Sequence, residues 1–178
     1  MEYSLGGSLM YLTDLIADLP KVTVRGTLER AVNGIYYDSR RVEKDGVFVC
    51  ITGFKTDGHN YILQAIEKGA TVIVVEKDIE LSSDVTVLKV PDTRLALALL
   101  ANAYYDYPSC KLRLIGVTGT NGKTSVTYLI RSILKKAGQK VGLLGTIANL
   151  IDEQKITSEH TTPESSDLQH LFSKMGEQ

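Results

Sequence analysis

The chain has 178 residues, of which 43% are hydrophobic and 23% charged, a balance typical of a folded globular protein. A formal net charge of −1 leaves no basic surplus to neutralise a phosphodiester backbone, so the sequence predicts no nucleic-acid partner. The apolar runs are too short to span a bilayer, and the first ten residues lack the pattern of a secretory signal. We therefore expect a cytoplasmic protein with no membrane contact.

The first part of the chain alternates between strand and helix patterns. Apolar residues recur at helical spacing in three segments, 11–19, 59–68 and 93–105. Runs rich in β-branched and aromatic residues predict four strands, at 34–37, 46–51, 71–75 and 85–90. The third of these runs is wholly apolar, which favours a strand buried on both faces of a sheet. The sequence thus predicts a small mixed α/β domain over residues 1–109.

The alternation restarts after Ser109. A strand, a glycine-rich loop, a helix ended by a glycine and a second strand are expected at 112–117, 118–122, 124–137 and 140–144. In that order they would form one right-handed βαβ unit. We interpret residues 110–178 as the beginning of a P-loop domain, with a parallel sheet and flanking helices, that these residues do not complete.

The segment 116–125, Gly-Val-Thr-Gly-Thr-Asn-Gly-Lys-Thr-Ser, has the pattern of a phosphate-binding loop. Glycines let backbone N–H groups converge on a phosphate, and the following helix directs its positive end to the same place. Lys123 would contact the β- and γ-phosphates and the Thr124 hydroxyl would ligate Mg²⁺, so we predict ATP and Mg²⁺ as cofactors and both residues as catalytic. The predicted nucleotide-binding residues are Gly119, Thr120, Asn121, Gly122, Lys123, Thr124 and Ser125. The alternative is an ordinary strand-to-helix turn in which Lys123 and Thr124 are incidental.

Several segments in order along the chain resemble the Mur ligases of bacterial cell-wall synthesis. The core of the loop, Gly-Thr-Asn-Gly-Lys-Thr at 119–124, is similar to the loop of that family. The other segments resemble the MurE type within it: Asp38-Ser39-Arg40, GFKTDGH at 53–59, AIEKGA at 65–70, PDTRLALALLANAYYDYPS at 91–109, Gly145-Thr146 and Thr161-Thr162-Pro163-Glu164. The resemblance extends from about Leu9 to near the last residue.

The resemblance implies a three-domain ATP-dependent ligase. Such an enzyme adds a third amino acid to UDP-N-acetylmuramoyl-L-Ala-D-Glu through an acyl phosphate, so its partners are this UDP-linked dipeptide and the amino acid. The positions carried over for the uridine diphosphate are Tyr37, Ser39, Phe54, Lys55 and Thr56, and those for the muramoyl group are Thr161 and Thr162. Two simpler interpretations stay open, because Ser39 suits a turn and Thr162 before Pro163 suits a helix N-cap.

The resemblance also places part of the family's machinery beyond Gln178. The further magnesium ligands, a modified lysine, the adenine pocket and the amino-acid-binding domain are expected there, so the 178-residue chain is expected to be inactive alone. Whether the added amino acid is lysine or diaminopimelate stays open. An incomplete second domain also suggests self-association. The alternative from a different class is a stand-alone, non-catalytic module that binds UDP-sugars or nucleotides.

Overall fold

The computed structural model describes residues 10–53, 56–82, 84–156 and 163–177. The chain divides into two compact units, Met1–Tyr104 (unit 1) and Tyr105–Gln178 (unit 2). The boundary lies close to the expected one near Ser109, and the assignment of the two parts as domains with separate ligands stays a prediction. Each unit is described by itself.

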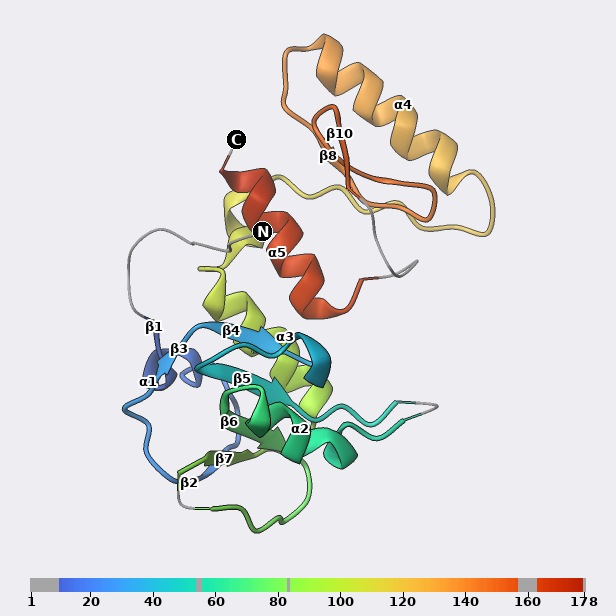
Figure 1. Ribbon diagram of the computed structural model, residues 1–178. Coiled ribbons are helices and arrows are strands. Elements are labelled where there is room, and N and C mark those ends of the chain that lie inside the picture. The colour runs from blue at the N-terminus through green and yellow to red at the C-terminus, as the bar shows by residue number, and fades with distance from the viewer. Residues whose placement is uncertain (1–9, 54–55, 83, 157–162, 178) are drawn as a thin grey trace. The chain divides into compact units, whose positions relative to one another are not determined.

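A five-stranded sheet with the order β2-β7-β6-β5-β4 forms the centre of unit 1 (Figure 1). Its strands are β2 Thr23–Arg25, β4 Gly34–Tyr36, β5 Gly46–Val49, β6 Ala70–Val75 and β7 Thr86–Lys89. The last four are parallel to their neighbours, with Val47 opposite Val72 and Val72 opposite Thr86, whereas β2 is antiparallel to β7. A separate antiparallel pair joins β1 Met10–Tyr11 to β3 Ala31–Val32. The predicted α/β class is confirmed.

Helices cover both faces of this sheet. Because side chains alternate across a strand, Val47 and Val49 of β5 face one core, which includes residues of α1 Leu12–Leu15 and α3 Thr93–Tyr104. Phe48 and Cys50 face the opposite core, which includes residues of α2 Ile62–Glu67. The two short 3₁₀ helices of the unit are η1 Ser39–Arg41 and η2 Gly58–Tyr61. The sheet is therefore buried on both sides, as the wholly apolar run in β6 predicts.

Unit 2 contains helices and a small antiparallel sheet. Its helices are η3 Pro108–Lys111, α4 Lys123–Lys136 and α5 Ser165–Gly176, and its sheet has the order β10-β9-β8, with β8 Gly142–Leu143, β9 Asn149–Ile151 and β10 Gln154–Ile156. Arg131 of α4 donates a hydrogen bond to the backbone carbonyl of Asp152, and Lys135 lies 2.9 Å from the Asp152 carboxylate. These contacts hold α4 to the turn between β9 and β10.

The end of α4 agrees with the sequence. Gly138 has a φ of +79°, its N–H donates to Lys135 O, and the Gln139 N–H donates to Leu134 O. These two bonds define a Schellman motif, in which a glycine after the helix adopts the left-handed conformation. The predicted stop of the helix at Gly138 is confirmed.

The expected βαβ unit around this helix does not form. Residues 112–117 pair with no strand in the part of the chain that the structure describes, and Leu114 and Ile115 are 53% and 54% exposed. β8 is two residues long and pairs antiparallel with β9. The prediction of a strand at 112–117 in a parallel sheet is therefore wrong for this structure. A parallel strand needs a neighbour on its edge and cover on its faces, and the described part of unit 2 provides neither for this segment.

Candidate functional site

The parallel strands of unit 1 bring several polar side chains to one edge of the sheet. β4, β5, β6 and β7 run in the same direction, so their carboxyl ends meet at the same edge. Ser39 follows β4, Asp57 and His59 lie beyond β5, Glu76 follows β6 and Thr93 lies beyond β7. In open α/β sheets, ligands bind at this edge.

Ser39 is held in a specific contact after β4. Its side chain is buried, and its hydroxyl donates a 2.6 Å hydrogen bond to Gln64 Oε1 of α2. Asp38 before it caps η1 by accepting from the Arg40 N–H at 3.0 Å. The Arg40 guanidinium also bonds the Asp38 carboxylate and holds its pKa below the ordinary value. The turn itself is capped by Asp38, whereas the Ser39 hydroxyl bonds a distant helix, and its two lone pairs still allow it to accept a ligand bond. Both interpretations of Ser39, as a turn residue and as a ligand contact, stay predictions.

The loop after β5 folds back on its own strand. The Gly53 N–H donates to Thr56 O and the Gly58 N–H donates to Ile51 O, both at 2.9 Å. A Cβ atom on Gly58 would lie 2.8 Å from the Ile51 nitrogen, so only glycine permits this approach. Thr56 is exposed within the loop. The predicted site residues Phe54 and Lys55 lie outside the described residues.

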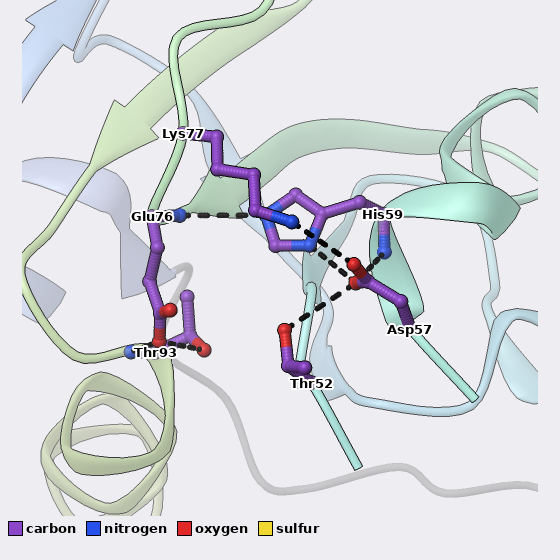
Figure 2. Close-up of polar contacts among 6 residues, drawn as sticks. All are labelled: Thr52, Asp57, His59, Glu76, Lys77 and Thr93. Atoms are coloured by element: carbon purple, nitrogen blue, oxygen red, sulfur yellow. Dashed lines mark hydrogen bonds and ion pairs between the residues drawn. The ribbon is translucent and has the colours of Figure 1, made fainter. Parts of the chain in front are cut away.

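Asp57 and His59 form a paired contact at the base of this loop (Figure 2). Asp57 Oδ1 accepts from the His59 backbone N–H at 3.0 Å and lies 2.6 Å from His59 Nδ1. Asp57 Oδ2 lies 3.1 Å from the Lys77 ammonium. The bonds from His59, followed by that from Lys77, hold the pKa of the Asp57 carboxyl well below its usual range. These contacts favour the ionised form of the Asp57 carboxyl.

Glu76 extends this contact to the start of α3. The Glu76 backbone N–H points to His59 Nε2 at 3.5 Å, and because an N–H can only donate, this contact requires the tautomer in which Nε2 accepts. The Glu76 carboxylate accepts from both the N–H and the hydroxyl of Thr93, each at 2.8 Å. Asp92 accepts from the next two N–H groups of α3, those of Arg94 and Leu95. Carboxylates thus satisfy the N-terminus of α3 from within the protein.

The helix that follows the glycine-rich loop of unit 2, α4, begins differently from α3. Gly119 and Gly122 have φ values of +149° and +78°, which an L side chain rarely adopts. Gly122 occupies the N-cap position of α4 but has no side chain to cap the helix, and its carbonyl accepts the first helical bond from the Val126 N–H at 2.9 Å. The N–H groups of Lys123, Thr124 and Ser125 precede that bond and have no helical acceptor. The first turn of α4 contains no acidic residue.

Lys123 and Thr124 lie at this helix start, next to its free N–H groups. The Lys123 ammonium folds back over the loop and donates to Gly119 O at 2.7 Å and to Thr120 O at 3.4 Å. Among the described residues, the Thr124 hydroxyl has no hydrogen-bond partner. Lys123 and Ser125 are exposed and Thr124 is partly exposed. A helix start without a capping side chain beside an exposed cation suits a phosphate, in contrast to the N-terminus of α3.

No group of three His, Cys, Asp or Glu side chains that could hold a metal occurs in the part of the chain that the structure describes. A magnesium ion bound by one hydroxyl and by nucleotide phosphates is compatible with this, because Mg²⁺ retains waters and uses phosphate ligands. The predicted residues Thr161 and Thr162 lie outside the described residues. Within the described residues, no helix is long and apolar enough to cross a membrane.

The sequence analysis did not anticipate the role of four residues at the sheet edge: Asp57, His59, Glu76 and Thr93. The sequence Asp-Gly-His could have indicated the contact between Asp57 and His59, because it places a capping carboxylate two residues before an imidazole. No sequence signal connects Glu76 to His59 or Thr93, because that contact depends on the parallel packing of β5, β6 and β7.

A doubly covered α/β sheet followed by a glycine-rich loop at an uncapped helix start defines a two-part α/β protein of the phosphate-loop class. The family model described as "Mur ligase family, catalytic domain" matches residues 31–105, and that described as "Mur ligase middle domain" matches residues 117–178. The chain belongs to the Mur ligase family.

The chain is similar to curated relatives of one type within this family. The UDP-N-acetylmuramoyl-L-alanyl-D-glutamate--2,6-diaminopimelate ligase of Clostridium perfringens is 46% identical over 93% of this chain, and that of Clostridium botulinum is 53% identical over 83%. The aligned part amounts to 34% and 31% of those proteins. The chain thus spans about a third of the length of the curated relatives it matches.

Solved structures agree on the fold. A structure of a UDP-N-acetylmuramoyl-L-alanyl-D-glutamate--2,6-diaminopimelate ligase covers 96% of this chain with a TM-score of 0.75, at 23% identity, and the chain covers 34% of it. MurF from Acinetobacter baumannii covers 72% of this chain with a TM-score of 0.58, at 28% identity, and the chain covers 28% of it. The first likeness, at this identity, concerns the fold alone.

Proposed function

We propose that this chain is the N-terminal part of an ATP-dependent ligase that joins 2,6-diaminopimelate to UDP-N-acetylmuramoyl-L-alanyl-D-glutamate in peptidoglycan synthesis. The observation that carries the proposal is the uncapped start of α4 beside Lys123, within the segment that matches the Mur ligase middle domain. The choice of diaminopimelate over lysine rests on the relatives, which are 2,6-diaminopimelate ligases. The expected cytoplasmic location stays a prediction.

In this proposal the two units bind different parts of the reactants. Ser39 and Tyr37, with the loop residues Phe54, Lys55 and Thr56, contact the uridine diphosphate, while Thr161 and Thr162 contact the muramoyl group. The N–H groups that begin α4 bind the phosphates of ATP, and the Thr124 hydroxyl ligates Mg²⁺. ATP supplies the phosphoryl group that activates the D-glutamyl carboxylate.

Lys123 has the clearest task among these residues. Its ammonium moves from the carbonyls of Gly119 and Thr120 onto the β- and γ-phosphates, where it offsets negative charge.

The exposed apolar side chains of unit 2, which include Leu114, Ile115, Leu129 and Ile133, support a further proposal of self-association.

A crossed binding experiment tests the two sites separately. The 178-residue chain is titrated with ADP and Mg²⁺ and, independently, with UDP. Lys123→Ala should weaken ADP binding about tenfold or more and leave UDP binding unchanged, whereas Ser39→Ala should weaken UDP binding by about 1 kcal/mol and leave ADP binding unchanged. Lys136→Ala, at the other end of α4, is the matched control. If neither nucleotide binds at millimolar concentration, the assignment is wrong.

A chimera tests the ligation itself. This chain replaces the matching third of the Clostridium perfringens relative, and the purified chimera is given ATP, Mg²⁺, UDP-N-acetylmuramoyl-L-alanyl-D-glutamate and diaminopimelate. We expect formation of the tripeptide product, and loss of that product in the Lys123→Ala chimera. A folded chimera that binds both nucleotides and makes no product would contradict the proposed activity.

A further inference from the structure

The base of the loop after β5 is held by more contacts than a helix start requires. An N-cap for η2 needs only the bond from the His59 N–H to Asp57 Oδ1. Here the imidazole of His59 is placed as well, with its side chain only 10% exposed, between the Asp57 carboxylate and the Glu76 backbone. The ring therefore joins two loops that are far apart in the sequence.

These contacts form one continuous path across the carboxyl edge of the sheet (Figure 2). The Thr52 hydroxyl lies 3.4 Å from Asp57 Oδ1, which ties the outgoing arm of the loop to the returning arm. His59 connects the returning arm to Glu76 at the end of β6, and Glu76 connects to Thr93 at the start of α3. Thr93 is 1% exposed, so the far end of the path is fixed in the core.

We propose that Asp57 and His59 are positioning residues that hold the loop after β5 in place for uridine diphosphate, by joining it to β6 and to the buried start of α3. The ligand part of this inference rests on the proposed function of unit 1. Neither side chain needs to touch the ligand. Their effect is to keep the described arms of the loop, residues 52–53 and 56–58, in one arrangement before the ligand arrives, which lowers the ordering cost of binding.

Lys77 adds a charge to this arrangement without being essential to it. Its ammonium is 63% exposed and pairs with Asp57 Oδ2, the oxygen that His59 does not use. An exposed ion pair contributes little to stability. The bonds from His59 are partly buried, so water competes with them less. Lys77→Ala should therefore have a smaller effect than any loss of the imidazole.

Conservative substitutions of His59 can separate the two contacts of the ring. The side-chain amide of His59→Asn places an N–H donor near the position of Nδ1, so it keeps the bond to Asp57 and loses the acceptor for Glu76. His59→Gln places an acceptor near the position of Nε2 and loses the donor to Asp57. His59→Ala loses both, and Asn60→Ala is the matched control on the same 3₁₀ helix, where the Asn60 side chain is exposed.

Two readouts are measured for each variant of the 178-residue chain. Amide hydrogen exchange at Gly53 and Gly58 reports on the loop, because both N–H groups are bonded only when it is folded back. Titration with UDP reports on the ligand. We expect His59→Ala to accelerate both exchange rates about tenfold and to weaken UDP binding about threefold or more, with the Asn and Gln variants intermediate and Asn60→Ala unchanged.

The outcomes distinguish this inference from the proposed function. Unchanged exchange at Gly58 in His59→Ala would overturn the inference, and so would faster exchange with unaltered UDP affinity. Exchange in β6 and β7 should not change, and a general acceleration there would overturn it too, since His59 would then be supporting the whole fold. If the wild-type chain binds no UDP, the proposed function is wrong for this site. If the wild-type chain binds UDP and His59→Ala changes neither the exchange rates of the loop nor the UDP affinity, only the inference is wrong.

Discussion

Two segments rich in branched apolar residues, one in each unit, differ in structure: one forms a buried strand and the other forms no strand. β6, Ala70–Val75, lies in the middle of its sheet, and its side chains from Val72 to Val75 are all fully buried. Residues 112–117 also contain leucine, isoleucine and valine, yet they form no strand, and Leu114 and Ile115 are exposed. The difference shows that a parallel strand is made by its neighbours, since its own sequence provides neither the partner edge nor the covering helices.

The largest expected difference between the units is the cost of removing a leucine from a helix. Leu100 of α3 is fully buried against the sheet, whereas Leu129 of α4 is 63% exposed. Leu100→Ala should lower the free energy of unfolding by about 2–5 kcal/mol, and Leu129→Ala by less than about 0.5 kcal/mol. Urea unfolding of both variants measures this. Equal losses would mean that α4 is packed in solution against something that covers Leu129.

The glycines that end two helices offer a second matched pair. Gly69 after α2 and Gly138 after α4 have φ values of +111° and +79°. An added Cβ on Gly138 meets nothing within 4 Å, but on Gly69 it would lie 2.8 Å from Lys44 Cα. Gly138→Ala should cost about 1 kcal/mol from the backbone alone, and Gly69→Ala about 2 kcal/mol or more because the close contact adds to it. Thermal unfolding of the two variants decides whether the second exceeds the first.

A smaller effect is expected where Ser39 joins the sheet edge to α2. Ser39→Ala should cost about 1 kcal/mol of stability, because the bond to Gln64 Oε1 is lost. A double-mutant cycle with Gln64→Ala isolates this pair, and the two single losses should not add. Fully additive losses would show that the hydroxyl and the amide do not interact in solution.

The smallest expected effect is a difference in reactivity between the two cysteines, one in each unit. Burial raises the pKa of the Cys50 thiol in unit 1 to about 12, whereas Cys110 in unit 2 is exposed. At pH 8 a thiol reagent should label one cysteine rapidly, and Cys110→Ser should abolish that fast phase. Because the unfolded state loses the Cys50 proton first, this group should lower stability as pH rises from about 9 towards 12. Rapid labelling of both thiols would mean that the core of unit 1 opens readily.

Sequence patterns were sufficient for most of unit 1. The strands over 46–51 and 71–75 and the helix over 93–105 were expected from residue type and spacing, and the structure has β5, β6 and α3 there. The helix expected over residues 11–19 is limited to Leu12–Leu15, with turns after it. Local patterns work in unit 1 because every such element finds a partner within the same unit.

The candidate site was predicted unevenly for the same reason. The glycine-rich loop is contiguous, so its spacing alone placed Lys123 and Thr124 at the start of a helix, where the structure has them. The path from Asp57 through His59 and Glu76 to Thr93 joins three loops, and no local rule connects them. The parallel order of strands, which brings the loops together, is known only once the sheet is assembled. The ligand roles of both groups of residues stay predictions.

The position of Lys123 implies a conflict between stability and function. A cation in the first turn of a helix is opposed by the helix dipole, and Lys123 is the first residue of α4. Its bonds to two loop carbonyls offset part of that penalty, yet a neutral or acidic residue there would suit the isolated helix better. A search for substitutions that stabilise α4 would therefore tend to replace Lys123. A side chain that is unfavourable for the isolated helix is thus one that a bound phosphate would use.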